Sequence, residues 1–583
     1  MRSCRSRLVA VFLAGGCALL ASAPALAQLS DTPVIRYRDT AHPVLGDAGM
    51  VATQNPYASA VGARILEQGG SAVDAAVAIG FTLAVTYPRA GNLGGGGFML
   101  VHDAADANTV AIDYRELAPR KASRHMYLDE NGEVDRTRSF FSHLAAGVPG
   151  TVAGMWYAHQ QFGKLPWKDL LAPAIEFARD GIEISYDMSV LLATQHERLC
   201  RNAATCRYFF KDDGEPYQPG DRLVQPDLAR TLELIAKHGA KGFYEGETAQ
   251  KIADEMARGG GLVDLESLAA YTVDVREPLA GDYRGWQIVT MPPPSSGGVH
   301  ILQMLNVLEH FDVNAMGSES ADSVHLLAEV ARLAYADRSK HLGDPDYFKV
   351  PVTWLTSKEY GKQLAGTIDM QRARPSSEVS PGTPPPYESA DTTHYSVIDR
   401  HGNVVANTYT LNFTFGSGIS VEGAGFLLNN EMADFVARPD TPNAFGLLGG
   451  DANAIEPGKR PLSSMTPTLM FGEDGAVIAT GSMGGSRIIM GVLQTVVNIV
   501  DHGMNIAEAA AAPRMHHQWL PDKLQLEPGF SPDTSRILRD RGHEVLDSRY
   551  SMGSTQTVSW QDGLFRGASD PRRPESATIA PAE

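Results

Sequence analysis

The sequence predicts an α+β fold in which helices and strands occupy separate stretches of the chain. Amphipathic helical patterns dominate residues 150–370, whereas short apolar segments alternate with turn residues after position 392. Because the two element types are segregated and do not alternate regularly, a layered α+β arrangement is favoured. With 583 residues, 43% of them hydrophobic, the chain can bury a large core.

The first 27 residues have the layout of a secretory signal peptide. Arginines precede an apolar run from residue 8 to about 23, and Ala25-Leu26-Ala27 suits signal peptidase. A membrane span is the alternative, but the run is short for a bilayer and glycines and a proline interrupt it. We therefore expect a periplasmic or secreted protein whose mature form has no stable membrane span.

The charge balance points away from nucleic acids. The chain carries a formal charge of -18, and removal of residues 1–27 deletes three arginines and no acids, which gives -18 minus 3, or -21. Phosphate neutralisation needs clustered Lys and Arg, and no basic run remains beyond the first residues. Small-molecule chemistry is favoured.

Cys200 and Cys206 are the two cysteines that remain after the signal peptide. In an oxidising compartment they are candidates for a local disulfide. A zinc pair is the alternative, but no second Cys or His pair lies nearby at ligand spacing. We expect a structural role for both thiols.

The N-terminal part is expected to form a strand and two helices within residues 51–85, the second helix from Ala72 to Val85. A glycine-rich run at 91–97 follows and precedes an apolar strand at 98–102. It lacks the Gly-Lys-Ser/Thr ending of a phosphate loop and opens no helix, so close backbone packing is the better interpretation. A short strand at 110–113 leads to Arg115.

The middle of the chain should be mostly helical, with candidates at 149–161, 167–180, 226–238, 246–258 and 320–340. The Pro- and Ser-rich run at 292–298 interrupts this region and should lead one helix toward the core. Residues 374–387 are rich in proline and poor in core residues, which is typical of an exposed, mobile linker.

Beyond the linker, apolar segments and turns predict a meandering sheet followed by helices. The expected strands lie at 393–399, 404–411, 425–428, 468–471 and 477–481, and the expected helices at 487–501 and 506–511.

Thr392 stands where the linker meets the first of these strands. A threonine at a chain end can carry chemistry alone, because its hydroxyl is the nucleophile and its α-amino group, with a reference pKa of about 7.7–8.0, acts as the base. An internal threonine lacks that base. An ordinary strand residue is the alternative.

Acyl transfer at Thr392 needs oxyanion donors and groups that hold the substrate. The glycine-rich segment 481–487 lies between a strand and a helix, so its N–H groups could point at an anion, although a purely geometric turn fits equally well. Arg115 and the hydroxyls of Ser463 and Ser464 suit a carboxylate, and Asp434 suits an ammonium. Together they match an amino-acid zwitterion, although each is singly more often an ion pair, cap or turn residue.

Several strings resemble γ-glutamyltransferases (γ-glutamyl transpeptidases). Thr-Thr-His-Tyr-Ser-Val at 392–397 and Pro-Leu-Ser-Ser-Met at 461–465 are examples. Others lie at 91–98, 113–116, 409–412, 429–435, 484–487, 513–519 and 567–572, so the likeness covers essentially the whole mature chain in order.

The resemblance implies an N-terminal nucleophile hydrolase with a four-layer αββα core. One precursor would cut itself between Asp391 and Thr392: the Thr392 hydroxyl attacks the Asp391 carbonyl, an N-to-O shift forms an ester, and water releases it. A large subunit (28–391) and a small subunit (392–583) would remain interlocked in one domain.

The resemblance also implies the site roles. Thr392 would carry a γ-glutamyl ester, Thr410 would activate it, and Gly484 and Gly485 would form the oxyanion hole. Donors would be glutathione and other γ-glutamyl amides, and water, an amino acid or a dipeptide would accept the group in a ping-pong scheme. The α-carboxylate would be held by Arg115, Ser463 and Ser464, and the α-amino group by Asn412, Glu431 and Asp434.

Neither a cofactor nor a metal is expected. His516 and His517 are adjacent and so point in different directions on a helix, and no carboxylate pair completes a site, which favours a structural role. Residues 435–450 resemble the lid loop of bacterial members, with Phe445 at a position usually held by tyrosine. The missing hydroxyl affects lid closure and the balance between water and amine acceptors.

Two alternatives stay open. A glutaryl-β-lactam (cephalosporin) acylase of the same fold would bind a substrate without the amino group and leave Asp434 without a cation partner. A non-catalytic periplasmic binding protein would fit the signal peptide, charge and size, and predicts a single unprocessed chain.

Overall fold

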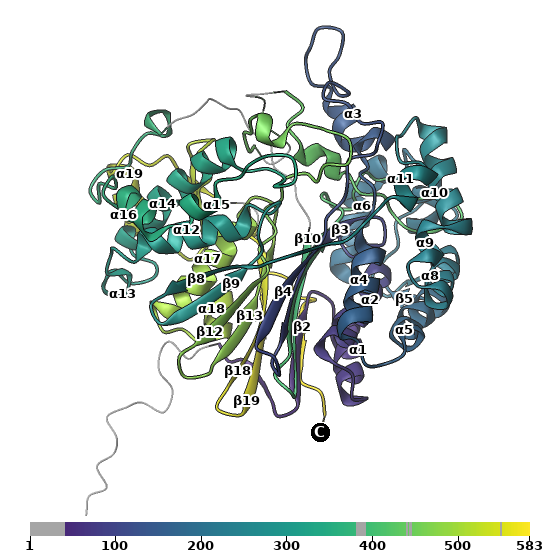
Figure 1. Cartoon of the computed structure of the whole chain (residues 1–583), viewed down its shortest axis with the longest axis horizontal. Helices are drawn as coiled ribbons and strands as arrows, with labels where there is room; N and C mark the ends of the chain where they lie inside the picture. The colour runs from purple at the N-terminus through teal and green to yellow at the C-terminus, as the bar shows by residue number, and fades with distance from the viewer. Residues whose placement is uncertain are drawn as a thin grey trace, which may run out of the picture. The chain divides into compact units, whose positions relative to one another are not determined.

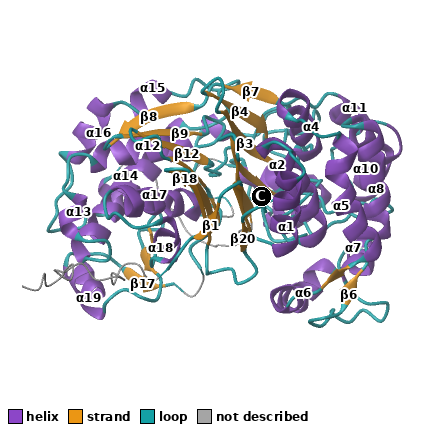
Figure 2. Cartoon of the chain, turned by 90° about the horizontal axis from the view of Figure 1, so that it is seen from below, coloured by secondary structure: helices purple, strands orange, loops and turns teal. Residues whose placement is uncertain are grey.

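The computed structural model describes residues 41–379, 392–438, 441, 443, 446–548 and 551–582. The signal peptide, Asp391 and Phe445 lie outside this part of the chain. Two antiparallel sheets face each other between two helical layers (Figures 1 and 2). The α+β class and the helix–sheet–sheet–helix layering are therefore confirmed.

The first sheet has seven strands within the described residues. The strands β2, β10, β11 and β3 form its centre, and Thr392 is the first residue of β10. In order across the sheet they are β20 (Ala577–Ile579), β2 (Gly49–Thr53), β10 (Thr392–Asp399), β11 (Val404–Thr410), β3 (Gly96–Asp103), β4 (Asn108–Tyr114) and β7 (Asp274–Arg276).

The second sheet packs against the first, with β18 lying on β10 and β2. Among the described residues it has eight strands, and β14 (Ser482–Met483) extends β18 beyond the main order. That order is β1 (Val44–Gly46), β19 (Leu564–Ser569), β18 (Ser554–Gln561), β13 (Val477–Thr480), β12 (Thr468–Gly472), β9 (Trp286–Thr290) and β8 (Leu279–Tyr283).

One helical layer covers the outer face of the first sheet. Its α2 is wholly buried, and a capping box between Ser71 and Asp74 satisfies its first N–H groups. The helices of this layer and its surroundings are α1 (Pro56–Glu67), α2 (Ala72–Thr86), α3 (Arg136–Phe141), α4 (Thr151–Phe162), α5 (Trp167–Asp180), α6 (Tyr186–Leu199), α7 (Ala203–Phe209), α8 (Pro226–His238), α9 (Lys241–Tyr244), α10 (Gly246–Gly259) and α11 (Leu265–Ala269).

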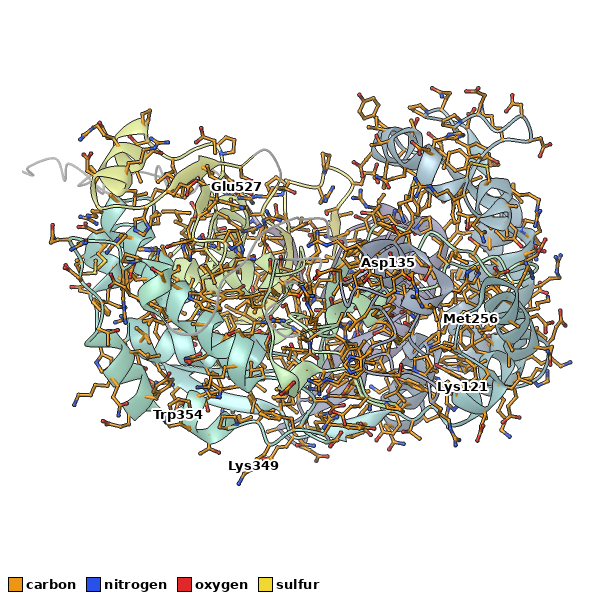
Figure 3. The ribbon with its side chains drawn as sticks, turned by 90° about the horizontal axis from the view of Figure 1, so that it is seen from above. Lys121, Asp135, Met256, Lys349, Trp354 and Glu527 are labelled. Carbon is orange, nitrogen blue, oxygen red and sulfur yellow. A yellow bond between two sulfur atoms is a disulfide. The ribbon has the colours of Figure 1, made fainter. Side chains whose placement is uncertain are left out.

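The other layer covers the second sheet. Its inner helices α12, α14 and α17 are almost fully buried, whereas Trp354 on α15 lies at the surface (Figure 3). The helices here are α12 (Gly297–Leu308), α13 (Val313–Met316), α14 (Ala321–His341), α15 (Val352–Leu355), α16 (Lys358–Ala365), α17 (Arg487–Val500), α18 (Ile506–Ala511) and α19 (Pro532–Asp540).

Short elements complete the described chain. Four 3-10 turns lie at His143–Ala145, Ser376–Glu378, Glu431–Asp434 and Asp451–Asn453. The remaining strands are β5 (Ile182–Glu183), β6 (Arg222–Leu223), β15 (Met515–His516), β16 (Leu524–Leu526) and β17 (Val545–Asp547).

The sequence patterns located most helices but missed strands that pair over long distances. The region read as mostly helical contains β8 and β9, and β18 and β19 were not predicted. The expected strand at 425–428 is wrong, because Leu427 and Leu428 make isolated bridges only. His516 and His517 do not lie on a helix, since Met515–His516 is strand β15.

Part of the expected linker is anchored. Ser376 is buried, and its N–H donates to Asp522 at 2.7 Å. The indole N–H of Trp519 donates to the carbonyls of Ser376 and Val379 at 3.1 and 2.9 Å. The expectation of an exposed linker is therefore wrong for Ser376 and Val379, whereas Pro375, Ser377 and Glu378 are exposed as expected, and residues 380–387 lie outside the described part.

Cys200 and Cys206 are joined by a disulfide at the end of α6 and within α7. No helix among the described residues combines the length and apolar character needed to cross a membrane.

Buried histidines should make the fold acid-sensitive. His394 on β10 is fully buried, with ring nitrogens 2.8 Å from the Thr408 hydroxyl and 3.0 Å from the Ser396 hydroxyl, and burial lowers its pKa to about 3. The unfolded-state pKa of histidine is about 6.5, so below that pH the unfolded chain binds a proton that the folded chain does not. The free energy of unfolding should therefore decrease by about 1.4 kcal/mol for each pH unit that the pH is lowered.

Replacing His394 with glutamine should remove that slope. Between pH 7 and pH 5 the wild type should lose about 2 kcal/mol more of its free energy of unfolding than His394→Gln, as denaturant unfolding at the two pH values would measure. Equal losses in the two proteins would show that His394 is protonated in the folded state.

Candidate active site

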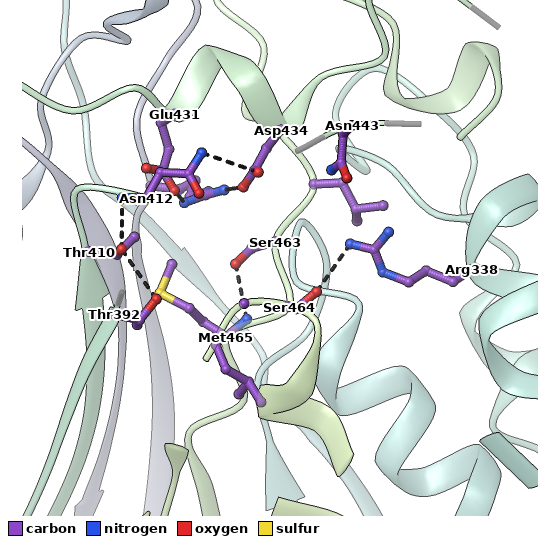
Figure 4. Close-up of a pocket in the computed structure, with 14 residues that line it drawn as sticks. Arg338, Thr392, Thr410, Asn412, Glu431, Asp434, Asn443, Ser463, Ser464 and Met465 are labelled. Atoms are coloured by element: carbon purple, nitrogen blue, oxygen red, sulfur yellow. Dashed lines mark hydrogen bonds and ion pairs between the residues drawn. The ribbon is translucent and has the colours of Figure 1, made fainter. Parts of the chain in front are cut away.

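Thr392 and Thr410 meet at one end of the central hairpin. They are paired in the antiparallel register of β10 and β11, and the Thr392 hydroxyl donates to the Thr410 hydroxyl oxygen at 3.3 Å (Figure 4). The Thr410 oxygen also accepts the Asn412 backbone N–H at 2.8 Å. Because the Thr392 hydroxyl is the donor, the lone pairs of its oxygen remain available for attack.

The glycines at 91–97 allow the backbone before β3 to pack closely against this hairpin. Gly96 is the register partner of Thr410 in β3, and a Cβ on Gly95 would collide with the Thr410 carbonyl oxygen. The expectation of close backbone packing at 91–97 is therefore confirmed, and the tight approach fixes the end of β11 beside Thr392.

Arg115 forms the charged centre of the site. One guanidinium nitrogen donates to Glu431 and to Glu116 and another to Asp434 at 2.5 Å, while Nε donates to the Pro461 carbonyl at 3.3 Å. The Arg115 side chain is only 1% exposed. Nearly all of its donors are therefore occupied by protein groups.

The carboxyl groups around Arg115 lie close together and are buried away from solvent. Burial raises the pKa of Glu431 well above its usual value, and burial also raises the pKa of Glu116 and Asp434, although Arg115 opposes each shift. Burial alone would lower the pKa of Arg115, but the neighbouring carboxylates outweigh it and hold that pKa above its usual value. The cluster therefore favours a proton shared among its acids or an added cation.

Asn412 links the hydroxyl pair to the carboxylates. Its side-chain amide donates to Asp434 at 3.3 Å and to the Asn430 carbonyl at 3.0 Å. Asn412 has a φ of 77°, a conformation that asparagine tolerates better than most residues.

Ser463 and Ser464 lie on the opposite wall, on a turn held by the loop before α12. The Ser296 N–H and hydroxyl donate to the Ser463 carbonyl at 2.8 and 2.7 Å, and the Ser463 hydroxyl accepts the Met465 N–H at 3.1 Å. The Pro- and Ser-rich run at 292–298 therefore positions this turn, in addition to leading α12 inward.

Gly484 and Gly485 connect β14 to the N-terminus of α17. Gly484 has a φ of 124° and Gly485 a φ of 57°, and a Cβ on Gly484 would lie 3.2 Å from the Gly553 Cα. Glycine is required at this turn because the backbone is left-handed there and another chain segment passes close by. Gly485 lines the pocket beside Thr392.

These groups line one pocket beside Thr392. The structure brings together most of the expected site residues, namely Arg115, Thr392, Thr410, Asn412, Glu431, Asp434, Ser463, Ser464 and Gly485. Gly484 is next to the lining. The cavity therefore combines a nucleophile, anion donors and a carboxylate cluster, which suits transfer of a small zwitterionic acyl group.

Other residues that no sequence pattern indicated also line the pocket, above all Arg338. It lies near the end of α14, and in Figure 4 Ser463 and Ser464 stand between it and Thr392. No sequence signal pointed to it, because 320–340 reads as an ordinary amphipathic helix. Asn443, Leu462, Met465 and Ile488 also line the cavity.

A second polar cluster lies outside this cavity. His325, Glu329 and His543 have ligand atoms within 4.8 Å of one another. However, His325 and His543 hydrogen-bond each other at 2.7 Å, and Glu329 is paired with Arg332. His517 is bonded to Asp522 at 3.1 Å and His516 to Gln518 at 2.8 Å. These contacts are those of structural histidines.

Comparison with known proteins agrees with this geometry. The gamma-glutamyltranspeptidase family model matches residues 58–580. The chain is 51% identical over 574 residues to the glutathione hydrolase proenzyme of Escherichia coli (strain K12), covering 98% of both. It resembles a cephalosporin acylase from Bacillus halodurans with a TM-score of 0.81 and 26% identity, over 95% of this chain and 99% of that one. For Helicobacter pylori gamma-glutamyltranspeptidase the TM-score is 0.55 at 47% identity, over 56% of this chain and 93% of that chain.

Proposed function

The chain belongs to the gamma-glutamyltranspeptidase family, and on this premise we propose that it hydrolyses or transfers the γ-glutamyl group of glutathione and related amides. The resemblance in its sequence motifs is thereby confirmed. It is an enzyme, and the relatives from Escherichia coli and Pseudomonas sp. are glutathione hydrolase proenzymes, which accords with a chain that matures by cutting itself.

One observation carries the proposal: the Thr392 hydroxyl faces a cavity that offers partners for both charges of an amino acid. Asp434 and Glu431 line the pocket together with Ser463 and Ser464, and in Figure 4 the two acids lie on one side of it and the two serines on the other. A γ-glutamyl group carries an ammonium and a carboxylate on its α-carbon, so its two charges would meet opposite walls while its γ-carbonyl reaches Thr392.

Maturation would use the same hydroxyl. In the precursor, Thr392 Oγ1 attacks the Asp391 carbonyl carbon, the peptide nitrogen leaves to become the Thr392 α-amine, and water hydrolyses the resulting ester. The Thr410 hydroxyl orients the attacking oxygen, as their 3.3 Å contact suggests. The freed amine then serves as the base that an internal threonine lacks.

In the catalytic cycle Thr392 Oγ1 attacks the γ-carbonyl carbon and the leaving amine takes a proton. The N–H groups of Gly484 and Gly485, at the N-terminus of α17, would stabilise the oxyanion. Asn412, Glu431 and Asp434 would hold the α-amino group. Water, an amino acid or a dipeptide would then accept the acyl group from the Thr392 ester.

We further propose a periplasmic or secreted enzyme made of a large subunit, 28–391, and a small subunit, 392–583. The sheet pairings favour their staying together after the cut. In the first sheet β10, β11 and β20 come from the small subunit and their neighbours from the large one, and in the second sheet β12 pairs with β9. Separation would break ladders in both sheets.

The test is a comparison of purified protein on γ-glutamyl and glutaryl p-nitroanilide, which differ only in the α-amino group. We expect γ-glutamyl turnover to be faster, and Asp434→Asn to lower kcat/KM for γ-glutamyl by about 10- to 100-fold through loss of a charge-assisted hydrogen bond, with a smaller effect on glutaryl. Faster glutaryl turnover by the wild type would favour the acylase. No turnover of either substrate by an uncut chain would favour a binding protein.

A further inference from the structure

Arg338 brings a second buried arginine to the cavity. The residue is 4% exposed, its Nε donates to the Ser296 hydroxyl at 2.9 Å, and its Nη2 donates to the Ser464 hydroxyl at 3.2 Å. No carboxylate among the described residues pairs with it. Both hydrogens of Nη1 and the second hydrogen of Nη2 also have no acceptor within that part of the chain.

Arg115 is in the opposite state. Its Nη1 donates to Glu431 and Glu116, its Nη2 donates to Asp434, and its Nε donates to the Pro461 carbonyl. A guanidinium has five N–H donors, so Arg115 has about one left for a ligand unless its acids move away. A carboxylate that enters the cavity therefore finds more unused donors on Arg338 than on Arg115.

The electrostatics favour an anion beside Arg338. Burial lowers its pKa to about 10, Asp434 raises that pKa and Arg115 lowers it, so the guanidinium remains charged but poorly compensated. A buried cation without a counter-ion is destabilised by the loss of its hydration, and a bound carboxylate would recover part of that cost.

We propose that Arg338 is a substrate-binding residue that contacts the α-carboxylate of the γ-glutamyl group together with Ser464. The inference rests on the proposed γ-glutamyl substrate. Because an arginine offers donors only, the Ser464 oxygen accepts from Arg338, and the Ser464 hydrogen is left to donate to the same carboxylate. The two side chains thus form one anion site on the wall opposite Asp434.

The experiment compares three p-nitroanilides on the mature enzyme: γ-glutamyl, glutaryl (no α-amine) and 4-aminobutanoyl (no α-carboxylate). Arg338→Gln should lower kcat/KM by about 10- to 100-fold for the two carboxylate-bearing donors, and by less than about threefold for 4-aminobutanoyl. Inhibition constants supply a second readout where turnover is slow: the value for free glutamate should rise in Arg338→Gln, and that for 4-aminobutanoate should stay constant.

Matched variants separate binding from folding. Arg332→Gln changes another buried arginine of α14, which pairs with Glu329 and Asp522 and does not line the cavity, so the ratio between the three donors should not change. Arg338→Lys keeps the positive charge but lacks the planar guanidinium that can donate two hydrogen bonds to one carboxylate. It should therefore recover only part of the affinity for glutamate. Cleavage into two chains on a denaturing gel reports that each variant has folded.

Three results would overturn the inference. An equal fall for all three donors would give Arg338 a structural role alone. If kcat/KM did not fall for any donor, Arg338 would not bind the substrate. If Arg338→Gln had no effect in a Ser464→Ala background, Arg338 would act only by orienting that serine. A wild type inactive on γ-glutamyl p-nitroanilide would instead refute the proposed function.

Discussion

Replacing Thr392 with alanine should leave a single uncut chain without measurable activity. The change removes the hydroxyl that faces Thr410 across the hairpin and, if the cut fails, also withholds the α-amine that serves as base. Loss of a nucleophile typically costs roughly 10⁴-fold or more in rate. A denaturing gel with N-terminal sequencing, together with γ-glutamyl p-nitroanilide assays, measures both effects.

Thr393 provides the matched control. It is the next residue of β10, so its side chain points to the other face of the sheet, and its buried hydroxyl has no hydrogen-bond partner among the described residues. Thr393→Ala should be cut and active, with stability reduced by about 1 kcal/mol. A wild type that remains whole and active, or a Thr392→Ala chain that is still cut after residue 391, would contradict the assignment of Thr392.

The sequence predicted the strand that begins beside Thr392 better than the surroundings of that residue, for a physical reason. Thr392 is marked by local features, a proline-rich run followed at once by an alternating strand, and β10 does begin there. The helices α2, α5, α8 and α10 are likewise local, since their apolar period lies within one segment. Capping residues such as Ser71 fix where they start.

Features that depend on distant contacts could not be read in this way. Strands β8 and β9 pair with each other in a region of helices, and β9 joins β12, which lies well over 100 positions later. Arg338 reads as a polar residue of a helix, and only tertiary packing turns it toward Ser464. The family resemblance suggested that Arg115 and Asp434 converge. It did not suggest that Arg115 donates to three carboxylates at once.

Arg115→Gln should have the second large effect, on both stability and binding. It leaves Glu431, Asp434 and Glu116 buried around a neutral side chain, and breaking a buried ion pair in this way typically costs about 3–5 kcal/mol. The α-amino site loses its shape when these carboxylates separate, so KM for γ-glutamyl donors should rise. Denaturant unfolding and steady-state kinetics measure the two losses.

The pH dependence distinguishes this loss from simple misfolding. Burial already raises the pKa of Glu431, Asp434 and Glu116, and without the guanidinium these pKa values should rise further. When the folded state raises the pKa of a carboxyl, the free energy of unfolding decreases as the pH rises from the unfolded-state pKa, about 4, to the folded-state pKa. The deficit of Arg115→Gln should therefore be small near pH 4.5 and grow toward pH 8.

Arg514 is the appropriate comparison because it is equally buried and paired with Asp570 at 2.7 Å, yet does not line the cavity. Arg514→Gln should also destabilise the protein, since it removes one of the two arginines that pair with the buried carboxylate of Asp570 and leaves Arg572 alone to compensate it. Its folded fraction should keep the wild-type KM. If both variants lose stability but share an unchanged KM, the Arg115 cluster supports the fold without shaping the substrate site, and recognition of the α-amino group must lie elsewhere.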